Sequence, residues 1–179
     1  MSIYLIRHGK TEANEKHLYC GSTDLPLSER GAEELKALSY AICPEGFVTS
    51  GMRRTEETLR ILFGTVPFSV DTRFREADFG SFEMKSYDDL KDDPAYQAWL
   101  SGDNEANVPP NGESGVQMTQ RVLEAFRELP NGTALIAHGG VIAAIMASLF
   151  PQEGKHRYQW QPENGHGYEI TNGTYRQIP

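Results

Sequence analysis

Two histidines stand at the ends of short apolar runs in this chain. His8 follows the run YLIR, His138 follows the run ALIA, and each histidine is followed by glycine. An imidazole has an ordinary pKa of about 6.5, so near neutral pH it serves as a nucleophile or as a proton carrier. A single histidine at a strand end is usually structural, but two in one pattern favour a shared chemical role.

Arginines accompany these histidines. Arg7 immediately precedes His8, and Arg53 and Arg54 follow the apolar residues that end at Thr49. The fork of a guanidinium group matches the oxygens of a phosphate group. Helices are expected to begin near these residues, where free backbone N–H groups attract anions and glycine allows a sharp turn. The combination predicts a pocket for an oxyanion, most simply phosphate.

The spacing of apolar residues predicts the elements that position these side chains. Strands are expected at 3–7, 46–49, 67–71 and 133–137, and helices at 28–42, 52–63, 86–91, 94–100, 114–129 and 141–150. Near the end, residues alternate on both sides of Asn172-Gly173, which predicts a hairpin over 166–178 with a type I′ turn.

Strands that alternate with helices predict an α/β fold, a three-layer α/β/α sandwich whose mainly parallel sheet has helices on both faces. Ligands of such sheets bind beyond the carboxyl ends of the strands, so His8 and His138 are expected to share that edge. A chain of 179 residues suits one domain, 1–179. Within it, the segment 72–110 is rich in Asp, Gly and aromatic residues, and we expect it to form a lid or insert.

The composition narrows the possible partners and the compartment. A net charge of −8 argues against nucleic acid and anionic membranes as partners, because both require a broad basic surface. The two cysteines, Cys20 and Cys43, form no CxxC pair, which argues against a disulfide framework or a zinc site. No charged leader or membrane-length apolar run is present in the sequence. We therefore expect a cytoplasmic monomer or small homo-oligomer.

Four motifs, taken in order, resemble those of a known family. RHGKTEAN, followed by GSTDLPLSERG, is similar to the opening signature of the histidine phosphatase superfamily, which includes the cofactor-dependent phosphoglycerate mutases. SGMRRTEET, READFGSFEM and AHGG are similar to its later motifs. The motifs extend from Arg7 to about Val141, and the resemblance implies a phosphoglycerate mutase-like fold.

The resemblance also implies a mechanism. His8 would be the nucleophile that attacks phosphorus and forms a phosphohistidine. The phosphoryl oxygens would be held by four residues, Arg7, Arg54, Asn14 and His138, with Gly139 beside them. Since these groups neutralise the developing charge, no metal or other cofactor is expected. The neighbouring arginines are expected to lower the pKa of His8 and keep its imidazole neutral.

A monoester also needs its leaving alkoxide protonated. Glu76 matches the acid of the third motif, so the resemblance implies that it acts first as general acid and then as general base. Asp78 and Glu83 lie close by in the sequence, and their spacing leaves both as alternatives for this role.

Three further details concern the substrate. NEKHLYCG, the sequence FEM ending at Met84, and NVPPNGE together resemble the alpha-ribazole phosphatases. That resemblance implies removal of the 5′-phosphate from alpha-ribazole phosphate, in assembly of the cobalamin nucleotide loop. It implies that Glu113 and the segment Tyr19, Cys20, Gly21 and Ser22 line the substrate side of the pocket.

Several alternatives to that activity remain. Mutases of the family are longer and cover the site with a middle insertion and a C-terminal tail, whereas this sequence ends just after the predicted hairpin, so we expect hydrolysis. A broad-specificity phosphatase for small molecules, a phosphoglycerate mutase-like enzyme, a phosphoprotein phosphatase and a non-catalytic phospholigand-binding protein are the other interpretations. The preferred partner is a small phosphorylated substrate.

Overall fold

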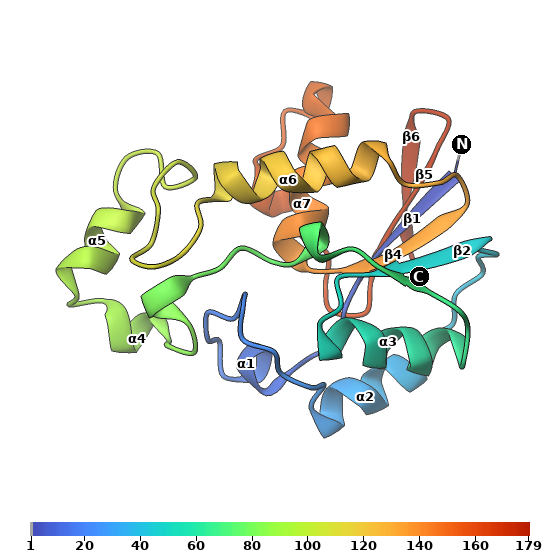
Figure 1. Cartoon of the computed structure of the whole chain (residues 1–179), viewed down its shortest axis with the longest axis horizontal. Helices are drawn as coiled ribbons and strands as arrows, with labels where there is room; N and C mark the ends of the chain where they lie inside the picture. Colours follow the sequence, from blue (N-terminus) through green and yellow to red (C-terminus); the bar gives the residue numbers. More distant parts are fainter. Residues whose placement is uncertain (1) are drawn as a thin grey trace.

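A six-stranded sheet forms the centre of the molecule (Figure 1). The computed structural model describes residues 2–179. The strands are β1 (Ser2–Arg7), β2 (Gly46–Thr49), β3 (Ser69–Val70), β4 (Thr133–Ala137), β5 (Gly167–Thr171) and β6 (Thr174–Ile178), in the order β3-β2-β4-β1-β5-β6. The first four in this order are parallel, and the hairpin β5–β6 extends the sheet in antiparallel fashion. The predicted mainly parallel sheet is confirmed.

Helices cover both faces of the sheet. They are α1 (Glu12–Glu15), α2 (Glu29–Lys36), α3 (Arg53–Phe63), α4 (Tyr87–Leu90), α5 (Pro94–Leu100), α6 (Gly115–Arg127) and α7 (Gly139–Leu149). Four short 3-10 helices accompany them: η1 (Thr72–Phe74), η2 (Gly80–Phe82), η3 (Pro151–Glu153) and η4 (Arg157–Trp160). In Figure 1, α6 and α7 lie on one side of the sheet and α2 and α3 on the other, which gives the expected three layers.

The central strands are apolar on both sides because both of their faces are buried. Ile3 and Leu5 of β1 pack in the core cluster that includes residues of α6 and α7. Tyr4 and Ile6 belong to the cluster on the opposite face, which includes Leu59 of α3. This alternation follows the two-residue period of a strand, and it explains why a central strand reads as a continuous apolar run.

Several boundaries differ from the sequence prediction. The helix expected over 28–42 ends at Lys36. Tyr40 and Ile42 still pack against the core, but they do so from an irregular segment that follows the helix. The strand expected over 67–71 is only Ser69–Val70. Helix α7 begins at Gly139, two residues earlier than predicted, with His138 as its N-cap. The four 3-10 helices were not predicted, since such short elements carry no clear apolar period.

The hairpin and the segment 72–110 have distinct local structures. Asn172 and Gly173 have φ values of 50° and 77°, and two positive φ angles are what the predicted type I′ turn requires. Helices α4 and α5 extend away from the sheet (Figure 1) and carry a separate apolar cluster around Phe82, Leu90 and Tyr96. None of the helices within residues 2–179 is long and apolar enough to cross a membrane.

Candidate active site

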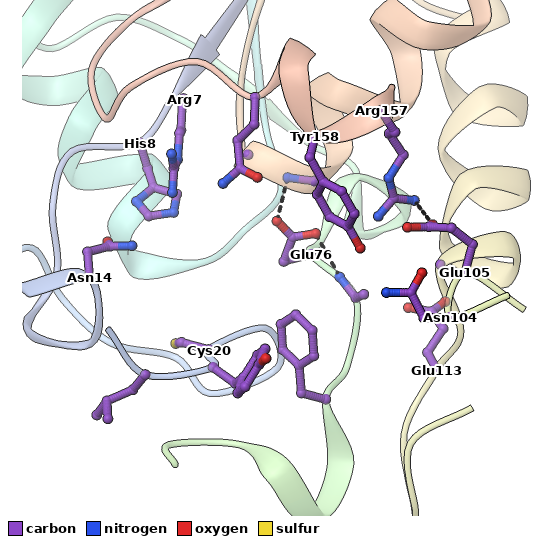
Figure 2. A pocket seen from close by; sticks show the side chains of 18 of the residues that line it. Arg7, His8, Asn14, Cys20, Glu76, Asn104, Glu105, Glu113, Arg157 and Tyr158 are labelled. Atoms are coloured by element: carbon purple, nitrogen blue, oxygen red, sulfur yellow. Dashed lines mark hydrogen bonds and ion pairs between the residues drawn. The ribbon is translucent and has the colours of Figure 1, made fainter. Parts of the chain in front are cut away.

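A pocket of about 370 Å³ lies beyond the carboxyl ends of β1 and β4 (Figure 2). The predicted site residues that line it are Arg7, His8, Asn14, Tyr19, Cys20, Arg54, Glu76, Glu113 and Gly139. His138 lies just behind this lining and packs edge-on against His8, with 5.2 Å between the ring centroids. The structure therefore brings together residues from every motif that the sequence singled out.

Strand pairing explains why the two histidines meet. In the parallel pair β1–β4, Arg7 is opposite Ala137, so the residues that follow them emerge at the same edge. The N–H of His8 also donates to the carbonyl of Ala137 over 3.0 Å. The exposed fraction is 6% for His8 and 1% for His138, so both are among the buried polar residues of the protein.

The imidazole of His8 is held in one tautomer. Its Nδ1 lies 2.6 Å from the carbonyl oxygen of Gly9, and because a carbonyl only accepts, Nδ1 carries the proton. The lone pair is then on Nε2. Burial lowers the pKa of His8 well below 6.5, and the charges of Arg54 and Arg7 lower it further. The result is a neutral imidazole with an unprotonated nitrogen, as a nucleophile needs.

Arg54 is the central cation of the site and is only 1% exposed. Its terminal nitrogens donate to the carbonyls of Gly21 and Thr23, each over 2.8 Å, and its Nε donates to Nδ1 of His138 over 3.3 Å. A guanidinium group has five N–H groups. Within residues 2–179, these bonds leave one N–H on each terminal nitrogen of Arg54 for a ligand.

Arg7 and Asn14 also keep donors for a ligand. Arg7 donates from Nη1 to the carbonyl of Pro162 over 2.8 Å, while its buried Nε has no partner within residues 2–179. Burial lowers the pKa of Arg7. The Oδ1 atom of Asn14 accepts from the N–H and the hydroxyl of Thr11, both at 3.0 Å, which leaves its NH₂ group as the donating end. An anion is the ligand that satisfies these donors.

Glu76 faces the same pocket from the segment between η1 and η2 (Figure 2). One carboxylate oxygen accepts from the N–H of Gly140 over 2.8 Å, and the other accepts from the N–H of Ala77 over 3.0 Å. Each carboxylate oxygen has a second lone pair, so both retain a position for a proton. These bonds fix the carboxyl group without using up its capacity for proton transfer.

Close approach explains one of the glycines that follow the histidines. Gly9, Gly139 and Gly140 do not have positive φ, so their backbone conformation alone does not require glycine. Close approach is the reason at Gly140, where a Cβ atom would lie 2.4 Å from a carboxylate oxygen of Glu76. A side chain there would displace that carboxyl group.

The two alternatives to Glu76 lie outside the pocket lining. Glu83 accepts from the N–H groups of Gly21, Ser22 and Phe79 at 2.9–3.0 Å. Asp78 accepts from the hydroxyl of Ser22 over 2.8 Å. Gly21 and Ser22 do not line the pocket either, because their backbone is turned toward these carboxylates. Glu83 and Asp78 thus fix the loop whose carbonyls hold Arg54.

Tyr19 and Cys20 line the pocket between this loop and the segment 72–110. The hydroxyl groups of Tyr19 and Tyr96 are hydrogen-bonded at 2.7 Å, and Tyr19 also packs against Phe79 and Trp99. Burial raises the pKa of the Cys20 thiol, which makes a reactive thiolate unfavourable. Both residues therefore shape the wall of the pocket.

The pocket lining also contains residues that sequence reasoning missed. They include Trp99, Leu100, Asn104, Glu105, Arg157, Tyr158 and Gln161. Arg157 and Glu105 form an ion pair of 2.6 Å with side chains only 18% and 24% exposed, and Figure 2 shows it on the opposite side of Glu76 from His8. Burial, and then a hydrogen bond to Glu105, raises the pKa of Tyr158. No motif marks these residues, so the sequence offered no signal for them.

Glu113 lines the pocket but is already paired. Its two carboxylate oxygens accept from Nε and Nη2 of Arg121, over 2.7 and 2.6 Å. Within residues 2–179, no cluster of three or more His, Cys, Asp or Glu side chains has the geometry to hold a metal ion.

A model of the histidine phosphatase superfamily (branch 1) matches residues 3–177. The chain belongs to this superfamily. The adenosylcobalamin/alpha-ribazole phosphatase of Salmonella typhimurium is 32% identical over 178 residues, which cover 92% of this chain and 87% of the relative. Among solved structures, the alpha-ribazole phosphatase of Shigella flexneri matches with a TM-score of 0.82 at 27% identity, covering 99% of this chain and 96% of the other.

A second similar structure is that of a mutase and not of a phosphatase. The phosphoglycerate mutase of Thermus thermophilus matches with a TM-score of 0.79 at 27% identity, covering 96% of this chain and 94% of the other. The predicted phosphoglycerate mutase-like fold is thus confirmed. The family and its neighbours identify the protein as a histidine phosphatase, an enzyme that hydrolyses a phosphomonoester.

Proposed function

We propose that this enzyme removes the 5′-phosphate of alpha-ribazole 5′-phosphate, in assembly of the cobalamin nucleotide loop, through a phosphohistidine on His8. The observation that carries the proposal is the neutral imidazole of His8, whose Nε2 is unprotonated in a pocket with unpaired arginine N–H groups. The names of the relatives support the choice of substrate.

In the first step, Nε2 of His8 attacks phosphorus while the bond from phosphorus to the ester oxygen breaks. The free N–H groups of Arg7 and Arg54 and the NH₂ group of Asn14 hold the phosphoryl oxygens, whose charge the two arginines neutralise. The carboxyl group of Glu76 gives its proton to the leaving oxygen, so that the alcohol departs neutral. The two arginines neutralise the charge and Glu76 supplies the proton, so the proposed step does not call for a metal ion.

His138 supports this arrangement from behind the pocket. Its contact with Arg54 helps to fix the guanidinium group that meets the phosphoryl oxygens. Gly139 lies at the start of α7, where the backbone N–H groups add a positive field. Both residues thus contribute to the electrostatics around the transferred group.

In the second step, a water molecule attacks the phosphohistidine. The carboxylate of Glu76 takes a proton from that water as the oxygen bonds to phosphorus. The bond between phosphorus and Nε2 of His8 breaks, and inorganic phosphate leaves with His8 again neutral. Glu76 is protonated once more and ready for the next ester.

The rest of the pocket supports a substrate about the size of a nucleotide. A volume of about 370 Å³ lies in the range of sites for small molecules. The wall distant from His8 combines aromatic rings with polar groups, as in Tyr158 and Asn104, which suits a planar base joined to a sugar.

We also propose that 1–179 is one domain in which the segment 72–110 acts as a lid. The support is that Trp99, Leu100 and Asn104 of this segment line the pocket. We further expect the enzyme to act in the cytoplasm as a monomer or small homo-oligomer, with no nucleic acid or membrane partner. The acidic charge of −8 supports the absence of such partners.

Release of inorganic phosphate by wild type and His8→Ala, with a chelator present, tests the proposal. The esters are alpha-ribazole 5′-phosphate, 3-phosphoglycerate, p-nitrophenyl phosphate and a phosphopeptide. We expect chelator-resistant turnover that is highest on alpha-ribazole 5′-phosphate and absent in the variant. Preference for another small ester would contradict the substrate. Release from none of them would contradict the activity and favour a mutase, tested with a bisphosphoglycerate primer, or a binding protein.

A further inference from the structure

The side chain of Arg121, on α6, contacts the backbone that leads to Glu76. Its Nη1 donates to the carbonyls of Arg73 and Arg75, both over 2.7 Å, and its Nη2 donates to the carbonyl of Glu76 over 3.1 Å. Residues 75 and 76 belong to no helix or strand, so no ladder of backbone hydrogen bonds fixes them. Arg121 supplies the donors that their carbonyls would otherwise lack.

Glu113 completes the set of partners of Arg121. The two groups form a paired, charge-assisted contact in which Nε and Nη2 donate to separate carboxylate oxygens. Together with the three backbone carbonyls, these contacts engage all five N–H groups of the guanidinium group. The side chains are 25% and 20% exposed, so both charges are largely removed from water.

The contacts of Arg121 help to place the carboxyl group of Glu76. That group is oriented at its tip by the N–H groups of Ala77 and Gly140, and at its base by the backbone that Arg121 holds. A shift of about 1 Å in a reacting group is enough to cost a large factor in rate. Arg121 itself does not line the pocket, but it contacts the backbone of Glu76 and the carboxylate of Glu113, which both do.

We infer that Arg121 is a positioning residue for proton transfer by Glu76, and that Glu113 is its counter-charge rather than a ligand of the substrate. This inference rests on the proposed function. Lysine cannot replace Arg121, because a single ammonium group lacks the planar fork that reaches five acceptors at once.

The dependence of the rate on the leaving group tests the inference. The alcohol of alpha-ribazole 5′-phosphate is a poor leaving group that needs a proton, whereas p-nitrophenolate departs readily without one. In Arg121→Lys, we expect kcat/KM for alpha-ribazole 5′-phosphate to fall by about 10²-fold, the scale of general acid catalysis, and kcat/KM for p-nitrophenyl phosphate by less than tenfold. The ratio kcat/KM reports formation of the phosphohistidine and excludes its hydrolysis, a step that is the same for both esters. Glu76→Gln should show the same imbalance. Equal losses on both esters, or no loss, would overturn the inference.

The controls separate positioning from damage to the fold. Both esters are measured on one preparation, so any unfolded fraction lowers the two rates equally and leaves their ratio unchanged. Arg127→Lys is the matched control, because Arg127 is an exposed arginine on the same helix, and its ratio should equal that of wild type. A changed ratio in this control would overturn the specific assignment to Arg121.

Glu113→Gln supplies an independent variant. It keeps the contacts of Arg121 with the backbone and weakens one pair, so the ratio should move in the same direction by a smaller factor, with KM for alpha-ribazole 5′-phosphate unchanged. A raised KM with unchanged kcat would make Glu113 a ligand of the substrate and overturn its assignment. If wild type hydrolyses neither ester, the proposed function fails as well, whereas an active wild type with equal losses refutes only the role of Arg121.

Discussion

Arg54 and His138 are joined by a hydrogen bond in which Nε of the guanidinium group donates to Nδ1 of the imidazole over 3.3 Å. His138 therefore carries its proton on Nε2, which donates to the hydroxyl of Ser50 over 2.8 Å. His8 carries its proton on Nδ1 instead. The two histidines are thus neutral in opposite tautomers, and only His8 has a free Nε2 for the substrate.

The stability of the protein should depend on pH because of this pair. Burial, followed by nearby positive charge, lowers the pKa of both His8 and His138 well below 6.5. Once the pH falls below 6.5, the unfolded chain binds protons that the folded chain does not, so the free energy of unfolding decreases. Urea unfolding at pH 7.5 and pH 5.5 should show the lower value at pH 5.5. His138→Gln should reduce the difference, and equal stability of wild type at both pH values would contradict the lowered pKa values.

Gly140→Ala should impair catalysis while the protein stays folded. The added Cβ would lie 2.4 Å from a carboxylate oxygen of Glu76, which moves away because it is the end of a flexible side chain. We expect about a tenfold or greater loss of kcat on alpha-ribazole 5′-phosphate, since proton transfer depends on that position. The control is Gly46→Ala, where no atom lies within 4 Å of the new Cβ, and its kcat should equal that of wild type. Equal kcat in both variants would contradict the role of close approach.

Glu83→Gln should lower stability without changing the preference between leaving groups. The carboxylate of Glu83 accepts from several backbone N–H groups, and an amide has only one oxygen to replace two. Loss of these acceptors should cost roughly 1–3 kcal/mol of unfolding free energy, measured in urea. A selective loss on alpha-ribazole 5′-phosphate relative to p-nitrophenyl phosphate would instead make Glu83 an acid of the reaction.

The sequence predicted those features that depend on short segments of chain. The strands that end at Arg7 and Ala137 were predicted because both of their faces are apolar, and their parallel pairing placed the histidines at one edge. The hairpin turn followed from Asn172-Gly173, where the residue types alone select the turn.

The remaining features depend on contacts between distant irregular segments. Arg157 meets Glu105 only because the 3-10 helix η4 and the irregular segment after α5 converge at the pocket, and neither has an apolar period or a motif. Arg121 was placed on a predicted helix, but its partners include backbone carbonyls, which no residue type reveals. The helix that was expected to reach Ile42 shows the same limit, because apolar spacing does not distinguish a helix from a loop that packs on the core.

The ion pair at the far end of the pocket should affect large substrates selectively. Arg157→Met removes the counter-charge of Glu105 and leaves a largely buried carboxylate without a cation in the pocket wall. We expect kcat/KM for alpha-ribazole 5′-phosphate to fall about tenfold, equivalent to about 1.4 kcal/mol, and kcat/KM for glycerol phosphate to stay unchanged. The double variant with Glu105→Gln should lose less than the sum of the two single losses. Equal losses on both esters would show that the pair does not contact the nucleoside.

Trapping of the phosphoenzyme tests the central claim most directly. The enzyme is mixed with alpha-ribazole 5′-phosphate, quenched with alkali within one turnover to preserve a phosphohistidine, and digested for mass spectrometry. We predict one added phosphoryl group on the peptide that contains His8, absent in His8→Ala and accompanied by a matching burst of free alcohol. Steady release of phosphate with no labelled peptide and no burst would contradict the predicted accumulation of a phosphohistidine on His8.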